Sequence, residues 1–241
     1  MRHYVLTRAA YGPAVPRRTN YQRLALTAGI TAPSLRAQTT RDLTWLVLID
    51  PADPLLKHRR AAFALSGLPV IFAPAEELER TGIHDRPYGP WSKHIEWGDT
   101  TLTTRLDDDD AFAPWAMERV QHAATEGERV VWTLPSGYRV VGHVAYELHW
   151  PLAQFVTLQA PAGDQTTVYE VNHAAFETLG PLRSATEDPA WLWVRHRMTR
   201  SRIDVGPQTK RKGRTEGRAR LITPQLRAAF PVDWRLIERL L

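Results

Sequence analysis

The sequence predicts an α/β protein built on a mixed, mainly parallel sheet with helices on its faces. Residues Thr44–Pro51 and Leu68–Pro74 are continuous apolar runs, which are typical of strands that are buried on both sides. A stretch with helical spacing lies between them, so strand and helix alternate along the first half of the chain. This alternation indicates a parallel sheet with right-handed crossovers.

The elements of the first half follow from apolar periodicity and from chain breakers. Gly12, Pro13 and Pro16 interrupt the chain after a short β-branched strand, and Pro114 suits the first turn of a helix. Residues 80–98 are polar and aromatic with several prolines, and we interpret them as irregular. We predict strands at residues 3–8, 44–51, 68–74 and 100–106, and helices at residues 20–26, 34–42, 55–66 and 115–125.

The second half is richer in strands. The sequences PSG and PAGD mark gaps of hairpin type. We predict strands at residues 129–134, 138–146, 155–158 and 166–171, a short aromatic segment at 190–197 and a last amphipathic helix from Asp233. Residues 205–220 are basic and nearly free of apolar side chains, which predicts a flexible segment. We therefore divide the chain into a domain at 1–204, this basic segment at 205–220 and a helical segment at 221–241.

Composition limits the classes of function. The 241 residues include no cysteine, which excludes disulfides, thiolate metal sites and cysteine nucleophiles. No apolar run has the length of a signal peptide or of a membrane span. We therefore expect a cytoplasmic protein, either free or peripheral at the inner face of the membrane.

The net charge of +5 is unevenly distributed. Residues 195–220 carry ten Lys and Arg and only two acidic residues, so the rest of the chain is slightly acidic. The excess of positive charge in residues 195–220 predicts an anionic partner, which is a donor diphosphate, an anionic membrane surface or nucleic acid. This stretch lacks the aromatic side chains on which unpaired bases stack, and this weighs against nucleic acid.

Four consecutive aspartates, Asp107–Asp110, follow the Thr-rich strand at residues 100–106. Ligands bind beyond the carboxyl ends of strands in α/β sheets, and carboxylates there suit Mg²⁺ or Mn²⁺ with substrate phosphates. In an extended segment Asp107 and Asp109 would share one face, with Asp108 and Asp110 on the other. The alternative is that one or two of these aspartates only cap the helix that follows.

Several motifs together resemble the bacterial rhamnosyltransferases. They are TTRLDDDDA, WLVLIDP, the opening YVLTRAAYGP, APSLRAQTT and AWLWVRH, and the resemblance spans roughly residues 3–200. More broadly the chain resembles glycosyltransferases of GT-A type, whose DxD motif binds a metal and the diphosphate of a nucleotide-sugar. The chain departs from the family after His196, where RMTRSR stands in place of a small, Asn-containing stretch.

The resemblance implies roles for individual residues. The implied metal ligands, for Mn²⁺ or Mg²⁺, are Asp107, Asp109, Asp110 and His196, with His196 alternatively a donor to phosphate. The residues implied to line the nucleotide pocket are Thr7, Arg8, Asp50, Arg105 and Asp107. His173 and the aromatic residues Trp91, Trp97, Trp191 and Trp193 are weaker candidates, because isolated histidines and large aromatic residues are usually structural.

Glu187 and Asp188 precede Pro189 and resemble the acidic pair that begins a helix near the acceptor in inverting GT-A enzymes. Asp188 would then be the catalytic base that takes the proton of the acceptor hydroxyl. The alternative is that Asp188 only caps a helix whose first residue is Pro189.

The sequence therefore predicts a metal-dependent, inverting glycosyltransferase. It would move a sugar, rhamnose by the family label, from a nucleotide-sugar donor to a hydroxyl acceptor, which is a glycan, a lipid-linked glycan or a small molecule. Two rival functions use the same features. A nuclease or nucleotidyltransferase would need a second acidic strand end for two metals, for which Asp50 is the candidate. A nucleic-acid-binding module would depend on the basic segment.

Overall fold

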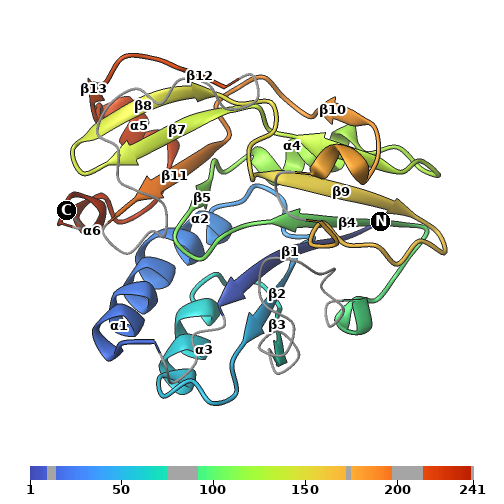
Figure 1. Ribbon diagram of the computed structural model, residues 1–241, viewed down its shortest axis with the longest axis horizontal. Helices are drawn as coiled ribbons and strands as arrows, with labels where there is room; N and C mark the ends of the chain where they lie inside the picture. Colours follow the sequence, from blue (N-terminus) through green and yellow to red (C-terminus); the bar gives the residue numbers. More distant parts are fainter. Residues whose placement is uncertain (10–14, 75–91, 172–174, 197–213, 240–241) are drawn as a thin grey trace.

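The computed structural model describes residues 1–9, 15–74, 92–171, 175–196 and 214–239. Within these residues the larger sheet has seven strands in the order β10-β6-β9-β4-β1-β2-β3 (Figure 1). Only β9 runs antiparallel to its neighbours, β4 and β6. The sheet is thus mixed and mainly parallel, as expected. Its strands are β1 (Arg2–Ala9), β2 (Thr44–Ile49), β3 (Val70–Pro74), β4 (Thr100–Arg105), β6 (Val130–Thr133), β9 (Val156–Pro161) and β10 (Leu182–Ser184).

The second sheet has the order β12-β8-β7-β11-β5, and β13 also pairs with β8. Its strands are β5 (Ala111–Phe112), β7 (Ser136–Val141), β8 (Val144–His149), β11 (Trp191–Arg195), β12 (Thr215–Glu216) and β13 (Arg220–Leu221). In Figure 1 it lies above the carboxyl ends of β1 and β4. The short strand β5 carries the chain from the end of β4 into this second sheet and pairs antiparallel with β11.

Helices cover both sheets. The described helices are α1 (Arg17–Leu26), α2 (Ala32–Arg36), α3 (Leu56–Ala64), α4 (Ala116–Ala123), α5 (Pro224–Ala229) and α6 (Trp234–Arg239). A π-helical turn at Thr27–Thr31 joins α1 to α2. No helix in the described part of the chain is long and apolar enough to cross a bilayer.

Alternate residues of the central strands enter different cores. Val5 and Trp45 pack on the face that the second sheet and α4 share, whereas Leu6 and Leu46 pack on the opposite face. Because strand side chains alternate between faces, a continuous apolar run is required where both faces are buried. A third core joins the second sheet to the end of α1 and to the last two helices, through Leu26, Val194, Leu226, Phe230 and Ile237.

Three local predictions are wrong. The predicted strand at 138–146 is a hairpin of β7 and β8, in which Gly142 at φ 57° makes the turn. The predicted helix at 34–42 ends at Arg36, because the side-chain amide of Gln38 donates to the Ser34 carbonyl at 3.0 Å in place of its own backbone. The predicted strand at 166–171 is a turn, where the Thr103 hydroxyl accepts the Val168 N–H at 2.9 Å.

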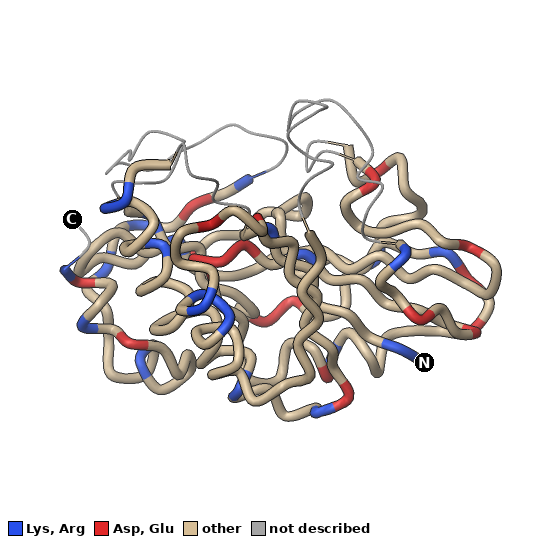
Figure 2. Tube along the Cα trace, turned by 90° about the horizontal axis from the view of Figure 1, so that it is seen from below, with Lys and Arg blue, Asp and Glu red and all other residues tan. Residues whose placement is uncertain are grey.

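The C-terminal segments differ from the predicted flexible linker and single helix. Residues 214–221 contribute β12 and β13 to the second sheet, and α5 precedes the predicted last helix. The rest of the basic segment lies outside the described residues. Figure 2 shows basic and acidic residues interspersed along the described chain.

Candidate active site

The candidate site lies where the strand order of the larger sheet reverses. The chain runs from β1 outward through β2 to β3 and then returns to place β4 on the other side of β1. The carboxyl ends of β1 and β4 therefore flank the topological switch point, the position at which open α/β sheets bind ligands. The aspartate run follows β4 after a single residue, Leu106, and so stands at this edge.

The four aspartates form a turn. The backbone N–H of Asp110 donates to the carbonyl of Asp107 at 3.3 Å. The expectation of an extended segment, with Asp107 and Asp109 on one face, is therefore wrong. The helix-cap alternative is wrong as well, because β5 follows the run directly and α4 begins only at Ala116.

Arg23 of α1 neutralises two of the aspartates. Its guanidinium donates to Oδ2 of Asp109 at 2.5 Å and to Oδ1 of Asp108. The Nε2 atom of His196 lies 2.8 Å from the same Oδ2 of Asp109. Burial alone would raise the pKa of Asp109, but the charge of Arg23 and the hydrogen bond with His196 outweigh it and lower the pKa to about 2. The chain itself therefore supplies a cation to the run.

The end of α1 is attached to the same turn. The hydroxyl of Thr27 lies 3.0 Å from the carbonyl oxygen of Arg23 and 3.3 Å from that of Asp108. Thr27 begins the π-helical turn, a distortion that is frequent at functional sites. These contacts hold Arg23 against the aspartates.

Asp110 is part of the framework of the site. Its Oδ1 accepts the backbone N–H of Val194 at 2.9 Å, and its Oδ2 accepts the side-chain amide of Gln154 at 2.7 Å. Burial, reinforced by the charges of Asp109 and Asp107, raises the pKa of Asp110 well above its usual value. Asp110 thus ties the aspartate turn to β11.

Asp107 contacts Arg105, and Arg105 and Arg8 both lie over the ring of Tyr169. Its two carboxylate oxygens each lie 3.3 Å from Nη2 of Arg105, and 29% of its side chain is exposed. The guanidinium carbons of Arg105 and Arg8 lie 5.4 and 5.1 Å from the centroid of the Tyr169 ring. Within the described part of the chain, Nε of Arg105 is buried without a hydrogen-bond partner. Guanidinium groups in this arrangement suit the oxygens of a diphosphate.

Thr7 and Asp50 lie at the carboxyl ends of β1 and β2, as predicted, with roles in the framework. The Thr7 hydroxyl is fully buried, donates to the Leu106 carbonyl at 2.8 Å and accepts from Nε1 of Trp45 at 2.9 Å. The partly exposed Asp50 accepts the Ala52 N–H at 2.7 Å in the turn after β2. The Thr7 hydroxyl therefore supports the loop that carries the aspartates.

The structure does not bring Asp188 to the aspartate turn. Asp188 is exposed before the start of β11, whereas His196 follows the end of that strand. A five-residue strand separates them by roughly 17 Å or more. Both helical interpretations of Asp188 are wrong, because Pro189 and Ala190 lead into β11 and no helix begins there.

The four predicted metal ligands are only partly brought together. Asp109 and His196 are in contact and Asp107 lies in the same turn, while Asp110 is directed to Val194 and Gln154. In the described ranges no group of three or more His, Asp or Glu side chains is arranged to hold a metal. His173 and Trp91 lie outside the described residues.

Three residues of the site were missed from the sequence. Arg23 and Gln154 are 86 and 44 positions from their aspartate partners, and Tyr169 lies in a segment that was predicted as a strand. A buried carboxylate needs a partner, so the run itself indicated that a cation or donor was required. Nothing in the sequence identified which of the 31 Lys and Arg it was.

Comparison with known proteins identifies a family. The family model described as "Putative rhamnosyl transferase" matches residues 14–207 of the 241. Curated proteins gave no match.

Two solved structures of TarS from S. aureus are similar to this chain. The first is 17% identical, covers 58% of this chain and 22% of its own, and has a TM-score of 0.37. The second, of residues 1–349, is 12% identical, covers 80% of this chain and 60% of its own, and has a TM-score of 0.45. This chain thus spans less than two thirds of either structure.

Proposed function

The chain belongs to the rhamnosyl transferase family whose model covers most of its length, and we propose that it transfers a sugar from a nucleoside diphosphate donor to a hydroxyl acceptor. The family label makes rhamnose the first candidate for the sugar. The fold provides the mainly parallel sheet and the carboxylate-bearing edge that a GT-A-like transferase requires.

The observation that carries the proposal is the Arg8–Tyr169–Arg105 stack beside Asp107 at the β1–β4 switch point. Burial would lower the pKa of Arg105, but Asp107 and Tyr169 outweigh it and raise the pKa, so this guanidinium stays charged. Two charged guanidiniums would bind the diphosphate and stabilise the charge that develops on it as the sugar leaves. Because ligands of open α/β sheets bind at the topological switch point, the nucleoside would extend across the ends of β1 and β2.

A divalent ion fits the chemistry of the aspartate turn. Asp107 and Asp109 offer carboxylate oxygens, and Mg²⁺ and Mn²⁺ commonly bind through one or two carboxylates, with substrate phosphates and water completing the shell. We propose that these two residues hold the ion, with His196 adjacent to Asp109. When bound, the ion would supply further positive charge to the diphosphate. Arg23 neutralises Asp108 and Asp109, so it would adjust its contacts as the ion binds.

The reaction also requires a base that accepts the proton of the acceptor hydroxyl. A catalytic base must lie within hydrogen-bond reach of the attacking hydroxyl, on the side opposite the leaving group. Asp188 lies at the far end of β11 from His196, too far from Asp109 to act at the aspartate turn. The displacement is proposed as inverting on the family resemblance alone.

A thermal-shift screen tests the proposal. Melting temperature is measured with UDP, GDP, dTDP and CMP, each with and without Mn²⁺. We expect one nucleotide to raise the melting temperature, and the rise to be larger with Mn²⁺, because a ligand that binds only the folded state stabilises it. Arg105→Gln and Asp107→Asn should lose this rise.

The matched control is Arg119→Gln on the exposed side of α4, which should keep the full shift. Stabilisation that is unchanged in both Arg105→Gln and Asp107→Asn would refute the β1–β4 switch point as the donor site.

A further inference from the structure

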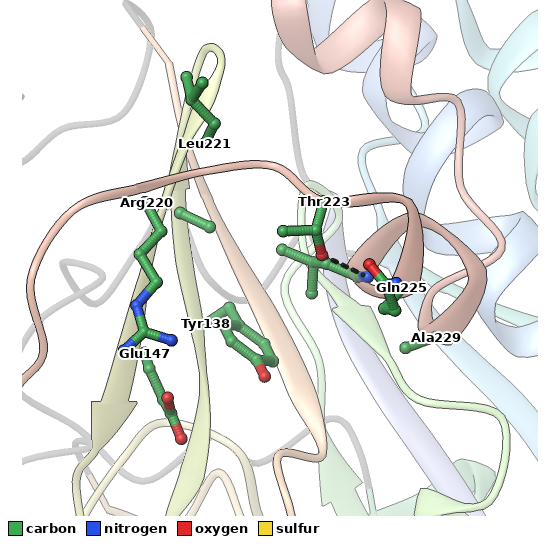
Figure 3. Close-up of a pocket in the computed structure, with 9 residues that line it drawn as sticks. Tyr138, Glu147, Arg220, Leu221, Thr223, Gln225 and Ala229 are labelled. Atoms are coloured by element: carbon green, nitrogen blue, oxygen red, sulfur yellow. Dashed lines mark hydrogen bonds between the residues drawn. The ribbon is translucent and has the colours of Figure 1, made fainter.

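A separate pocket lies between the second sheet and α5. It has a volume of about 300 Å³, at the lower end of the range for small-molecule sites. Figure 3 shows Tyr138 between Arg220 and Glu147 on one side and Gln225 and Ala229 of α5 on the other. The lining residues are Tyr138 of β7, Ala145 and Glu147 of β8, Arg220 and Leu221 of β13, Thr223, and Gln225, Leu226 and Ala229 of α5.

The polar side chains of this pocket have hydrogen-bonding capacity to spare. Within the described residues, the side chains of Tyr138, Glu147, Arg220 and Gln225 form no hydrogen bond or ion pair with the protein, and the last three are exposed to water. By contrast, the neighbouring Thr223 hydroxyl is already used, because it accepts the Leu226 N–H at 3.2 Å as the N-cap of α5. The pocket therefore presents a phenol, a carboxylate, a guanidinium and an amide to whatever enters it.

The charges of the pocket balance. The charges of Glu147 and Arg220 have opposite effects on the pKa of the Tyr138 phenol. Burial and the charge of Glu147 raise the pKa of the phenol, and Arg220 opposes them. A phosphate would be repelled by Glu147 and an amine by Arg220, so the pair favours a neutral ligand with many hydroxyl groups. Carboxylate oxygens accept hydrogen bonds from hydroxyls and guanidinium N–H groups donate to them. The ring of Tyr138, which packs edge-to-face with Phe230, adds apolar surface to the lining.

The pocket shares its sheet with the candidate active site. Tyr138 of β7 pairs with Leu192 of β11, and Val194, two residues further along β11, donates to Asp110. Strand spacing places the Cα atoms of Tyr138 and Val194 on the order of 8 Å apart. The pocket and the aspartate turn therefore lie against neighbouring strands of one sheet.

We infer that the pocket at Tyr138, Glu147 and Arg220 is a saccharide subsite that binds one neutral sugar unit of the acceptor. The assignment of this sugar to the acceptor rests on the proposed function. The binding of a sugar to the pocket does not depend on the donor, the metal or turnover. Leu221, which is 75% exposed at the rim, would cover part of the bound ring.

The test is ligand-observed NMR and isothermal titration calorimetry on the full chain, without nucleotide or metal. The probes are the methyl glycosides of rhamnose, glucose and galactose, with glucose 1-phosphate as a charged comparison. We expect at least one neutral glycoside to bind more tightly than the phosphate. Glu147→Gln and Tyr138→Phe should each weaken its binding about tenfold. The first removes the charge of a hydrogen-bond acceptor, and the second removes the phenol hydroxyl.

Glu126→Gln, an exposed substitution in the loop after α4, is the matched control and should leave the affinity unchanged. Absence of binding for all neutral glycosides, preference for the phosphate, or full affinity in both pocket variants would each overturn the inference. The nucleotide-dependent thermal shift should survive Glu147→Gln, so failure of the saccharide site and failure of the donor site give different results.

Discussion

At the scale of single residues, the four aspartates are neighbours in sequence but have different environments. Asp109 is held charged, with a pKa of about 2, by Arg23 and His196 despite its burial. The next residue, Asp110, has its pKa raised by burial and by the charges of Asp109 and Asp107. Asp107 is the most exposed of the four, and its partner Arg105 lies at the end of the strand that precedes the turn. A turn rather than a strand creates this difference, because it directs each carboxylate to another element.

Removal of the resident cation should destabilise the fold. In Arg23→Gln, the buried carboxylates of Asp108 and Asp109 lose their positive partner. Breaking a buried ion pair by removing one member costs about 3–5 kcal/mol of unfolding free energy, because a charge is left uncompensated. Urea unfolding at pH 7 measures this loss.

The double variant Arg23→Gln/Asp108→Asn is the internal control for that measurement. It removes one of the two carboxylate charges that Arg23→Gln leaves unpaired, so it should recover part of the lost unfolding free energy. Arg18→Gln, an exposed position on the same helix, should change little. A loss of less than 1 kcal/mol in Arg23→Gln would contradict the pairing described here.

At the scale of elements, the attachment of β7 to β11 depends on the absence of a side chain. A Cβ atom at Gly137 would stand 2.2 Å from the ring of Trp191. That ring is fully buried, stacks on Phe155 at 4.5 Å and donates from Nε1 to the Leu134 carbonyl at 2.7 Å. The stacking on Phe155 and the hydrogen bond to Leu134 fix the Trp191 ring, so moving it to admit a Cβ atom would cost free energy.

Gly137→Ala is therefore expected to lower the unfolding free energy by about 1–3 kcal/mol or more, as for other overpacked cores. Chemical denaturation measures the effect. Gly98→Ala is the matched comparison, since its Cβ would meet Arg2 at an ordinary 3.5 Å. Equal stability of the two variants would show that the ring of Trp191 is not confined as described.

At the scale of the whole molecule, a buried histidine joins the sheet to α4. The Nε2 atom of His3 lies 2.7 Å from the Thr104 hydroxyl, and its Nδ1 lies 3.3 Å from the Gln121 amide. Burial lowers the pKa of His3 to about 3. The folded state therefore holds this imidazole neutral over a range in which the unfolded state takes up a proton, between about pH 6.5 and pH 3.

Stability should accordingly fall on acidification. The contribution of neutral His3 is fully present above the unfolded pKa and is lost as the pH falls from 6.5 toward 3. Between pH 7 and pH 5 the unfolding free energy should drop by about 2 kcal/mol through this residue. Urea unfolding at both pH values measures the drop, and His3→Gln should remove it. A drop of the same size in His3→Gln would assign it to other groups.

Much of the architecture was predictable because its signals are local. The runs at Thr44–Pro51 and Leu68–Pro74 are strands as predicted, and a helix crosses between them. Only β2 is buried along its length, because β3 lies at the edge of the sheet and is partly exposed. Errors arose where one side chain decided the outcome. The helix predicted at residues 34–42 ends early because of the Gln38 side chain, and the strand predicted at residues 138–146 is two strands joined by a turn at Gly142. The same sequence could have continued in either case, so periodicity alone did not identify these ends.

The sequence by itself determined that this chain is a mixed α/β protein with carboxylates at a strand end, because apolar runs and a charge cluster are properties of neighbouring residues. The tertiary structure alone decided the partners of those carboxylates. Arg23, Gln154 and His196 lie 86, 44 and 87 positions from the aspartates they contact. Such pairings are set by how helix and sheets pack, because burial of the carboxylates makes a partner obligatory and only the packed chain determines which residue is near enough to serve.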